Sequence, residues 1–330
     1  MMPRHRIIIL ITLILSFTLA AKAEPNGLKK ASFIPQWVPQ AQFAGYYVAY
    51  EKGIYEKYGL DLTIIPGGPQ HSSLDVLKKG KADFATLWLS SGIQTRAQGV
   101  KVVNIAQMVQ RSALMLVAKT ASGIKKPEDL EGGKVGLWGT IFQVQPRAFF
   151  QRYQLKVKVI PQTFSVNLFL RDGVDAASAM WYNEYHTILN AGIDPDELTT
   201  FFFHEHGLNF PEDGLYVLEE TVRRDPELCR SFVKASIEGW QQAFAHPDET
   251  LDIVMKNLKK EYIPATRVHQ KWMLARMKDL ILPSDTPIPM GTLLTSDYDR
   301  VARGLFDSGL IDNIPEFNAF HQECRSHVEK

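Results

Sequence analysis

Short runs of apolar residues alternate with amphipathic segments between residues 31 and 118. This alternation is typical of strand–helix–strand units on a mostly parallel sheet. The apolar runs predict strands at 31–34, 60–65, 82–85, 102–106 and 114–118. The pattern therefore indicates the α/β class.

Two helices are expected between the first three strands. One begins near Pro39, which suits an early helical position, and ends at Gly59. Its apolar face consists of Phe43, Tyr47, Tyr50 and Ile54. The other helix can be capped by Ser72 or Ser73 and stops at Gly80.

A second α/β series runs from residue 126 to residue 203. After a helical turn at 127–130, strands are expected at 134–138, 157–160, 177–180 and 199–203, and helices at 145–153, after Ser165 and at 182–191. Beyond a strand at 215–218 the pattern turns helical. Helices begin at Asp225-Pro226 and His246-Pro247, and later ones are expected at 265–278, 296–308 and 315–327.

The length of the chain exceeds what one hydrophobic core usually organises, so two lobes are expected. We expect the helical tail to pack on the first lobe, which then comprises residues 28–114 plus 215–330, with 115–214 as the second lobe. The chain then crosses between the lobes near 111–118 and 210–218. Such a double crossing is a candidate hinge.

The N-terminus predicts the compartment. Arg4 and Arg6 precede an apolar run that begins at Ile7 and is too short for a membrane anchor. It leads to the small-x-small site Ala21-Lys22-Ala23. We therefore expect a signal peptide at residues 1–23, cleaved after Ala23, and a soluble, periplasmic mature protein.

The net charge bears on the choice of partner, and the cysteine content bears on disulfide formation. A net charge of +1 with mixed signs gives no electrostatic reason to expect nucleic acid. The cysteines are Cys229 and Cys324. An oxidising compartment permits one disulfide between them, but we expect two buried, unpaired thiols, because spacing alone does not establish the geometry that a disulfide requires.

Six short segments form a distinctive set: Gln36-Trp37-Val38-Pro39, residues 44–49 (AGYYVA), 51–55 (EKGIY), 58–62 (YGLDL), 80–84 (GKADF) and 126–136 (KPEDLEGGKVG). Together they resemble the NMT1/THI5-like family of solute-binding proteins. The resemblance covers roughly residues 30–245. It implies a type II periplasmic-binding-protein fold, in which two α/β lobes enclose a ligand cleft.

The resemblance also implies a function. The protein would be a monomer without a cofactor that captures a small-molecule solute and delivers it to the permease and ATPase of an ABC importer. Members of the family carry pyrimidine precursors of thiamine, and more distant ones bind sulfonates, nitrate or riboflavin. Eukaryotic synthases of the family use a cysteine-rich motif and a donor histidine, but the corresponding residues here are 209–214 (NFPEDG) and 89–92 (LSSG), which argues against the synthase activity.

Ligands in open α/β sheets bind at the carboxyl ends of strands, where helix N-termini expose amide donors. The first two such junctions offer Gln36, Trp37, Gln42, Phe43, Trp88, Ser90 and Ser91. Trp37 and Trp88 can form a slot in which a flat ring stacks. The alternative is that both are ordinary core tryptophans.

Two further junctions lie in the second series. The first presents Thr140 and Phe142, and the Thr140 hydroxyl either meets a polar group of the ligand or caps a helix. The next holds Trp181, Tyr182, Asn183 and Glu184. A carboxylate beside aromatic rings suits an aminopyrimidine or a protonated amine, although Glu184 can also complement a helix dipole.

The crossings contribute the remaining candidates. Asp213 either closes over the solute or belongs to the turn chemistry of the hinge. Arg111 is either the counter-ion of an acidic solute or a surface residue of the hinge. His204 and His206 have the spacing of two zinc ligands on one strand face, but two ligands are not a site, so we expect no metal.

Other function classes stay open. An enzyme acting on pyrimidine precursors would need a nucleophile, a base or a cofactor lysine, which the sequence does not reveal. A sensory module would instead dock on a membrane receptor. Within the binding class, the aromatic candidates favour a pyrimidine precursor, then another heterocycle, and last a sulfonate or nitrate, which would need a cation.

Overall fold

The structure is a computed structural model that describes residues 27–285 and 287–325. The expected signal peptide lies outside these residues. Within them, no helix has both the length and the apolar character needed to cross a membrane.

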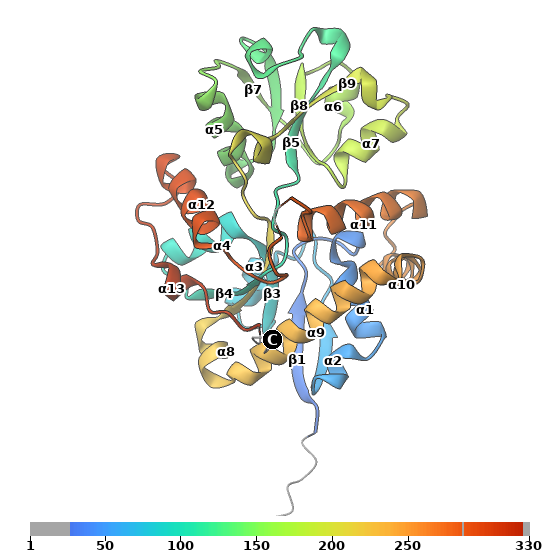
Figure 1. Cartoon of the computed structure of the whole chain (residues 1–330), viewed down its shortest axis with the longest axis vertical. Coiled ribbons are helices and arrows are strands. Elements are labelled where there is room, and N and C mark those ends of the chain that lie inside the picture. Colours follow the sequence, from blue (N-terminus) through green and yellow to red (C-terminus); the bar gives the residue numbers. More distant parts are fainter. Residues whose placement is uncertain (1–26, 286, 326–330) are drawn as a thin grey trace, which may run out of the picture.

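Two five-stranded sheets with flanking helices form two lobes, which Figure 1 shows one above the other. The first sheet has the strand order β2-β1-β3-β10-β4. Its strands are β1 (Lys29–Ile34), β2 (Leu60–Ile64), β3 (Phe84–Trp88), β4 (Val102–Gln107) and β10 (Asp213–Leu218). β1 pairs in parallel with β2 and β3, and β10 runs antiparallel between β3 and β4.

The second sheet has the order β7-β6-β8-β5-β9. Its strands are β5 (Leu114–Lys119), β6 (Lys134–Leu137), β7 (Lys158–Pro161), β8 (Ala176–Met180) and β9 (Leu198–Phe202). β6 is parallel to β7 and β8, whereas β5 is antiparallel to β8 and β9. The α/β, two-lobed prediction is confirmed. Both sheets are mixed because the strand that follows each crossing, β5 or β10, enters its sheet antiparallel.

Most helices surround the first sheet. They are α1 (Ala44–Glu51), α2 (Ile54–Lys57), α3 (Ser73–Lys78), α4 (Leu89–Ala97), α8 (Glu219–Arg224), α9 (Pro226–Ala245), α10 (Pro247–Lys260), α11 (Arg267–Ile281), α12 (Thr295–Asp307) and α13 (Phe317–Phe320). The second lobe carries α5 (Val144–Arg152), α6 (Asn167–Leu170) and α7 (Glu184–Asn190). α11 packs on the first lobe and also contacts α7, so it bridges the two lobes (Figure 1).

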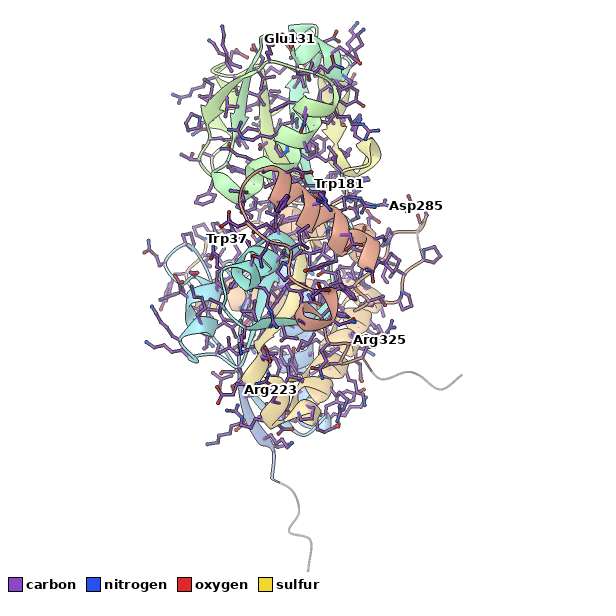
Figure 2. All side chains as sticks on the ribbon, turned by 90° about the vertical axis from the view of Figure 1, so that its left-hand side faces the viewer. Trp37, Glu131, Trp181, Arg223, Asp285 and Arg325 are labelled. Atoms are coloured by element: carbon purple, nitrogen blue, oxygen red, sulfur yellow. The ribbon has the colours of Figure 1, made fainter. Side chains whose placement is uncertain are left out.

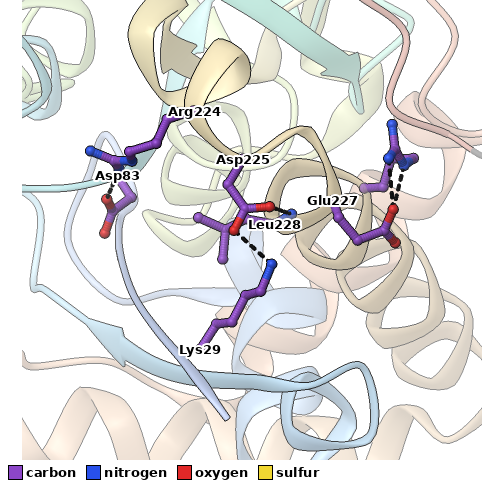
Figure 3. Close-up of polar contacts among 7 residues, drawn as sticks. Lys29, Asp83, Arg224, Asp225, Glu227 and Leu228 are labelled. Carbon is purple, nitrogen blue, oxygen red and sulfur yellow. Dashed lines mark hydrogen bonds and ion pairs between the residues drawn. The ribbon is translucent and has the colours of Figure 1, made fainter. Parts of the chain in front are cut away.

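Helix α9 begins as its sequence predicts. The Asp225 carboxylate accepts the N–H of Leu228 at 2.9 Å and pairs with Lys29 at 2.6 Å (Figure 3). Pro226 occupies the first turn, where its missing N–H costs nothing. Further along α9, the buried Phe232 ring stacks on Phe84 of β3 with centroids 3.9 Å apart, which fixes the helix on the sheet.

Helices α1 and α9 approach closely at two glycines. A Cβ on Gly239 would lie 2.2 Å from the carbonyl oxygen of Gly45, and a Cβ on Gly45 would lie 2.3 Å from the Trp240 ring. Any side chain at either position would therefore push the helices apart.

The first expected helix, from Pro39 to Gly59, is divided. Its start is a 3-10 turn at Ala41–Phe43, and Gly53, with φ of +65°, separates α1 from α2. Tyr50 was expected on the apolar face but is 47% exposed, and Tyr46 and Ala49 are buried instead.

The last expected helix, 315–327, is also shorter than predicted. Among the described residues it is only the four-residue α13, after which the chain turns extended. There Gln322 N donates to Asn104 O at 2.9 Å and Cys324 N to Ile105 O at 3.2 Å. Pairing with the edge of β4 replaces the helix, and it covers backbone groups that would otherwise be unpaired.

Candidate ligand-binding cleft

A cavity of about 480 Å³ lies between the lobes, within the size range of small-molecule sites. Figure 2 shows Trp37 at the level where the lobes meet. The first lobe lines the cavity with Gln36, Trp37, Gln40, Gln42, Gly68, Pro69, Ser72, Ser73, Leu74, Leu87, Trp88 and Ser91. The second lobe lines it with Trp138, Phe142, Phe164, Met180, Tyr182, Asn183 and Glu184.

Aromatic rings of the two lobes meet at two points of this cavity. Trp37, just after β1, has its ring centroid 4.9 Å from that of Phe164, which follows β7. Trp88, the last residue of β3, lies 5.0 Å from Phe142, with the two ring planes nearly perpendicular. Since each pair joins one lobe to the other, a change in lobe spacing changes the width of the space between the rings.

Glu184 places a carboxyl group in the cavity wall at the first position of α7. Its Oε2 accepts the N–H of Met180 at 3.0 Å, and its Oε1 accepts from Asn183 Nδ2 at 2.8 Å. Burial raises the pKa of Glu184 to about 7, because these hydrogen bonds offset only part of the lost hydration. Burial also raises the pKa of the neighbouring Tyr182 well above its usual value, so its hydroxyl is neutral.

Asp213, the first residue of β10, is buried behind the cavity and does not line it in this structure. Gln36 Nε2 donates to Asp213 Oδ1, and Gln42 Nε2 donates to Oδ2 at 2.8 Å. Burial raises the pKa of Asp213 to about 7. Asp213 therefore orients two amide side chains that do line the cavity.

The two crossings are held together next to Asp213. The buried Glu212 carboxylate accepts the N–H of Ala113 and the hydroxyl of Ser112, the latter at 3.2 Å. Asn209 Oδ1 accepts the N–H of Ser112 at 2.9 Å, and Asn209 Nδ2 donates to Gln110 O at 3.0 Å. Residues 209–214 thus form part of the connection between the lobes.

The cavity unites nine of the candidate residues. They are Gln36, Trp37, Gln42, Trp88, Ser91, Phe142, Tyr182, Asn183 and Glu184. Phe43 instead belongs to the hydrophobic core, and Ser90 is buried within α4. Trp181 packs outside the cavity, with the Arg276 guanidinium 4.6 Å from its ring centroid.

Thr140 opens the 3-10 helix Thr140–Gln143, which brings Phe142 to the cavity. Other lining residues escaped the sequence analysis, although most of them also follow strand ends. Trp138 comes after β6 and Phe164 after β7, and the lining residues that come after β2 are Gly68, Pro69, Ser72, Ser73 and Leu74. Applying the strand-end rule to every parallel strand would have found them.

Helix α11 adds a polar contact between the lobes that the sequence did not suggest. His269 Nε2 lies 2.8 Å from Asn183 Oδ1, and His269 Nδ1 lies 2.9 Å from Nδ1 of His186 on α7. The Trp272 indole stacks on His186 and donates to the carbonyl of Trp181 at 2.9 Å. Through Asn183, this contact reaches the Glu184 carboxylate in the cavity wall.

The remaining polar candidates lie away from the cavity. Arg111 pairs with Asp285, as a surface hinge residue would. His204 and His206 lie on a 3-10 helix, Phe203–His206, and not on a strand, and His206 Nδ1 bonds the Tyr153 hydroxyl at 2.6 Å. In the described part of the chain, no cluster of three or more His, Cys, Asp or Glu could hold a metal ion.

Both cysteines are buried free thiols. Cys229 at the start of α9 and Cys324 in the C-terminal segment belong to the same core cluster, and their side chains interact. The expectation of two buried, unpaired thiols agrees with the structure, which nevertheless brings the pair together.

Comparison with known proteins decides the family. The model of the family described as NMT1/THI5 like matches residues 40–250. This chain belongs to that family.

The relatives of this NMT1/THI5-like protein include solute-binding proteins. A riboflavin-binding protein of Chloroflexus aurantiacus is 26% identical over 249 residues, which cover 72% of this chain and 68% of the relative. A formylaminopyrimidine-binding protein of Halalkalibacterium halodurans is 24% identical over 272 residues, covering 77% and 80%. A pyrimidine phosphate synthase of Saccharomyces cerevisiae matches over 38% of each chain only, at 23% identity.

Solved structures share the fold of the NMT1/THI5-like protein. The periplasmic aliphatic sulphonate binding protein of Escherichia coli superposes with a TM-score of 0.67 at 14% identity, covering 88% of this chain and 96% of that one. The family resemblance and the periplasmic-binding-protein fold expected from the sequence are therefore confirmed.

Proposed function

We propose that this protein is the exported solute-binding component of an ABC importer and that it binds a flat, neutral or cationic heterocycle, such as a pyrimidine precursor of thiamine. One observation carries the choice of ligand. The cavity has aromatic walls from both lobes and the buried carboxyl group of Glu184, and none of the described residues that line it is lysine, arginine or histidine. Relatives that bind formylaminopyrimidine and riboflavin support a nitrogen heterocycle.

The same observation disfavours an anionic solute. A sulfonate or nitrate keeps its charge at all physiological pH values, and a buried charge needs an opposite charge or several directed donors. Here the buried Glu184 lines the cavity, and the buried Asp213 lies behind the lining residue Gln42, to which it is hydrogen-bonded. Both side chains are acidic. The shared fold with a sulphonate binding protein therefore does not extend to its ligand class in this proposal.

Each part of the cavity has a proposed role. The indoles of Trp37 and Trp88 stack on the faces or edges of the ring and supply most of the buried apolar area. Glu184 accepts from a ring N–H, an amino group or a protonated nitrogen, which are strong hydrogen bonds when the acceptor is ionised. Tyr182 and Ser91 supply neutral hydroxyls for the remaining polar atoms.

Lobe closure delivers these groups to the ligand together. In the proposed cycle, residues 28–114 plus 215–330 and residues 115–214 move as two bodies about the crossings that Glu212 and Asn209 tie together. Closure brings Trp37 to Phe164 and Trp88 to Phe142, so the ligand selects the closed form. Export would use residues 1–23 as a signal peptide, cleaved after Ala23.

A thermal-shift screen tests the proposal with three probes: N-formyl-4-amino-5-aminomethyl-2-methylpyrimidine, riboflavin and ethanesulfonate. A ligand that binds the folded state raises the melting temperature by mass action. We expect a rise with a heterocycle and none with the sulfonate. The bound heterocycle should also be recovered unchanged after prolonged incubation, since an enzyme would convert it.

Two cavity variants locate the site. Trp37→Ala and Glu184→Ala should each abolish the shift while leaving the ligand-free protein folded. Tyr262→Ala removes a side chain that is 92% exposed and lines neither lobe's part of the cavity, so it should bind like wild type. Binding that survives both cavity variants, or a shift produced by ethanesulfonate alone, would contradict the proposal.

A further inference from the structure

A second cavity of about 280 Å³ adjoins the first between the lobes. It is lined by Pro39, Gln40, Asn183, Thr187, Asn190, Leu258, Ile263, Pro264, Ala265, Thr266, His269 and Gln270. Two of these residues, Gln40 and Asn183, also line the main cavity. The two spaces therefore share a wall made of one residue from each lobe.

The chemical character of the second cavity differs from that of the first. Its described lining contains no ring of phenylalanine, tyrosine or tryptophan and no carboxylate, lysine or arginine. Its polar groups are the amides of Gln40, Asn183, Asn190 and Gln270, the hydroxyls of Thr187 and Thr266, and the imidazole of His269. Such groups both donate and accept hydrogen bonds, which suits hydroxyl or amide groups and does not compensate a full charge.

The imidazole in this wall is itself held neutral. Burial lowers the pKa of His269, and the adjacent His186 imidazole lowers it further. The Nδ1 atoms of the two rings are 2.9 Å apart, so one of them must accept the hydrogen bond through its lone pair. The two imidazoles therefore cannot both be cations. The cavity thus has no fixed positive charge that would attract a phosphate or carboxylate.

Asn183 and Gln40 form the border between the two cavities. Asn183 Nδ2 donates to Glu184 on the main-cavity side, and Asn183 Oδ1 bonds His269 on the other side. Gln40 Nε2 donates to Gln42 Oε1 at 2.6 Å. Because the two residues belong to opposite lobes, a wider separation of the lobes would open a path between the cavities at this border.

From this juxtaposition we propose that the second cavity receives an uncharged chain bearing hydroxyl or amide groups that is attached to the heterocycle in the main cavity. The inference rests on the proposed function and specifies its ligand class. At about 280 Å³ the second cavity falls just below the range of about 300–1,000 Å³ typical of separate ligand sites, so it suits an extension of a ligand.

Two pairs of probes test the inference, each with a shared ring. Riboflavin carries a hydroxylated chain where lumiflavin has a methyl group. N-formyl-4-amino-5-aminomethyl-2-methylpyrimidine carries a formamide on the carbon attached to ring position 5. In 4-amino-2,5-dimethylpyrimidine the same carbon is a plain methyl group. Isothermal titration should show the extended member of the bound pair binding at least tenfold more tightly than its ring-only partner.

Variants of the second cavity separate its contribution. Ala265→Phe fills the cavity and Asn190→Leu removes an amide from its wall, and neither residue lines the main cavity. Each should weaken the extended probe at least tenfold and leave the ring-only probe unchanged. Asn313→Leu, at an exposed position that lines neither cavity, is the matched control and should bind both as wild type does.

The outcomes distinguish the two proposals. If both members of a pair bind equally and the variants change nothing, the chain-binding role is overturned and the heterocycle proposal stands. If the variants weaken both members alike, the chain-binding role is overturned as well. If no member of either pair binds and ethanesulfonate does, both proposals fail.

Discussion

Replacing Glu184 by glutamine removes the charge of the cleft carboxyl group and keeps its size at the start of α7. Burial raises the pKa of Glu184 from 4.5 to about 7. Each pH unit of such a rise corresponds to about 1.36 kcal/mol of preference for the protonated form. The ionised carboxylate therefore costs the folded state about 3 kcal/mol once the pH exceeds 7.

The sign follows from the two protonation states. An unfolded glutamate loses its proton near pH 4.5, whereas the folded protein holds it to about pH 7. The stability that this proton contributes is complete below pH 4.5 and is lost as the pH rises through 7. Between pH 4.5 and pH 8, the free energy of unfolding of Glu184→Gln should therefore rise relative to wild type by about 3 kcal/mol.

Urea denaturation followed by tryptophan fluorescence at pH 4.5, 6 and 8 measures this difference. Glu205→Gln, at an exposed glutamate, corrects for the removal of one negative charge from the molecule. Asp213→Asn should behave like Glu184→Gln, because burial raises the pKa of Asp213 from 3.8 to about 7. A wild-type minus Glu184→Gln difference that stays constant with pH would show that the carboxyl group is hydrated, and the assignment of a buried cleft acid would fail.

Three other perturbations test the fold and the contact between lobes. Phe232→Ala removes a fully buried ring and should lower the free energy of unfolding by about 3–5 kcal/mol. Phe306→Ala, at a position that is 42% exposed, should change it little. Equal losses for the two variants in urea denaturation would refute the packing of Phe232 in the core. Asp225→Ala should cost about 1 kcal/mol by removing the N-cap of α9, and an unchanged midpoint would contradict that role. Burial lowers the pKa of both His186 and His269, so as the pH falls below 6.5 the free energy of unfolding of wild type should fall relative to that of His269→Gln; a difference between the two proteins that stays constant with pH would exclude this contact as the cause.

The elements that the sequence predicted well are those whose signals are local. Short apolar runs bounded by turn residues correctly marked the strands, and Asp225-Pro226 correctly marked the start of α9. The last helix was predicted wrongly because a long-range contact replaced it. Residues after Phe320 pair with the edge of β4, more than two hundred residues away, and local propensity carries no information about that edge.

The cleft shows the same division between local and long-range information. Trp37 and Glu184 follow strand ends, and this local signal was enough to predict that both line the cavity. Trp181 stands next to the same junction, yet it packs against Arg276 of α11. Neither the partner helix nor its position could be predicted, because α11 comes from the helical tail and its docking depends on tertiary packing.

The position of α11 links the proposed ligand contact and the contact between the lobes in one network. Glu184 meets the ligand space, Asn183 hydrogen-bonds Glu184 on one side and His269 on the other, and His269 belongs to a helix packed on the opposite lobe. A donor on the ligand favours the ionised form of Glu184, and that form strengthens its bond from Asn183. The amide of Asn183 is then held with its oxygen toward His269, so in the proposed binding mode the carboxylate that recognises the ring also favours the contact that keeps the lobes together.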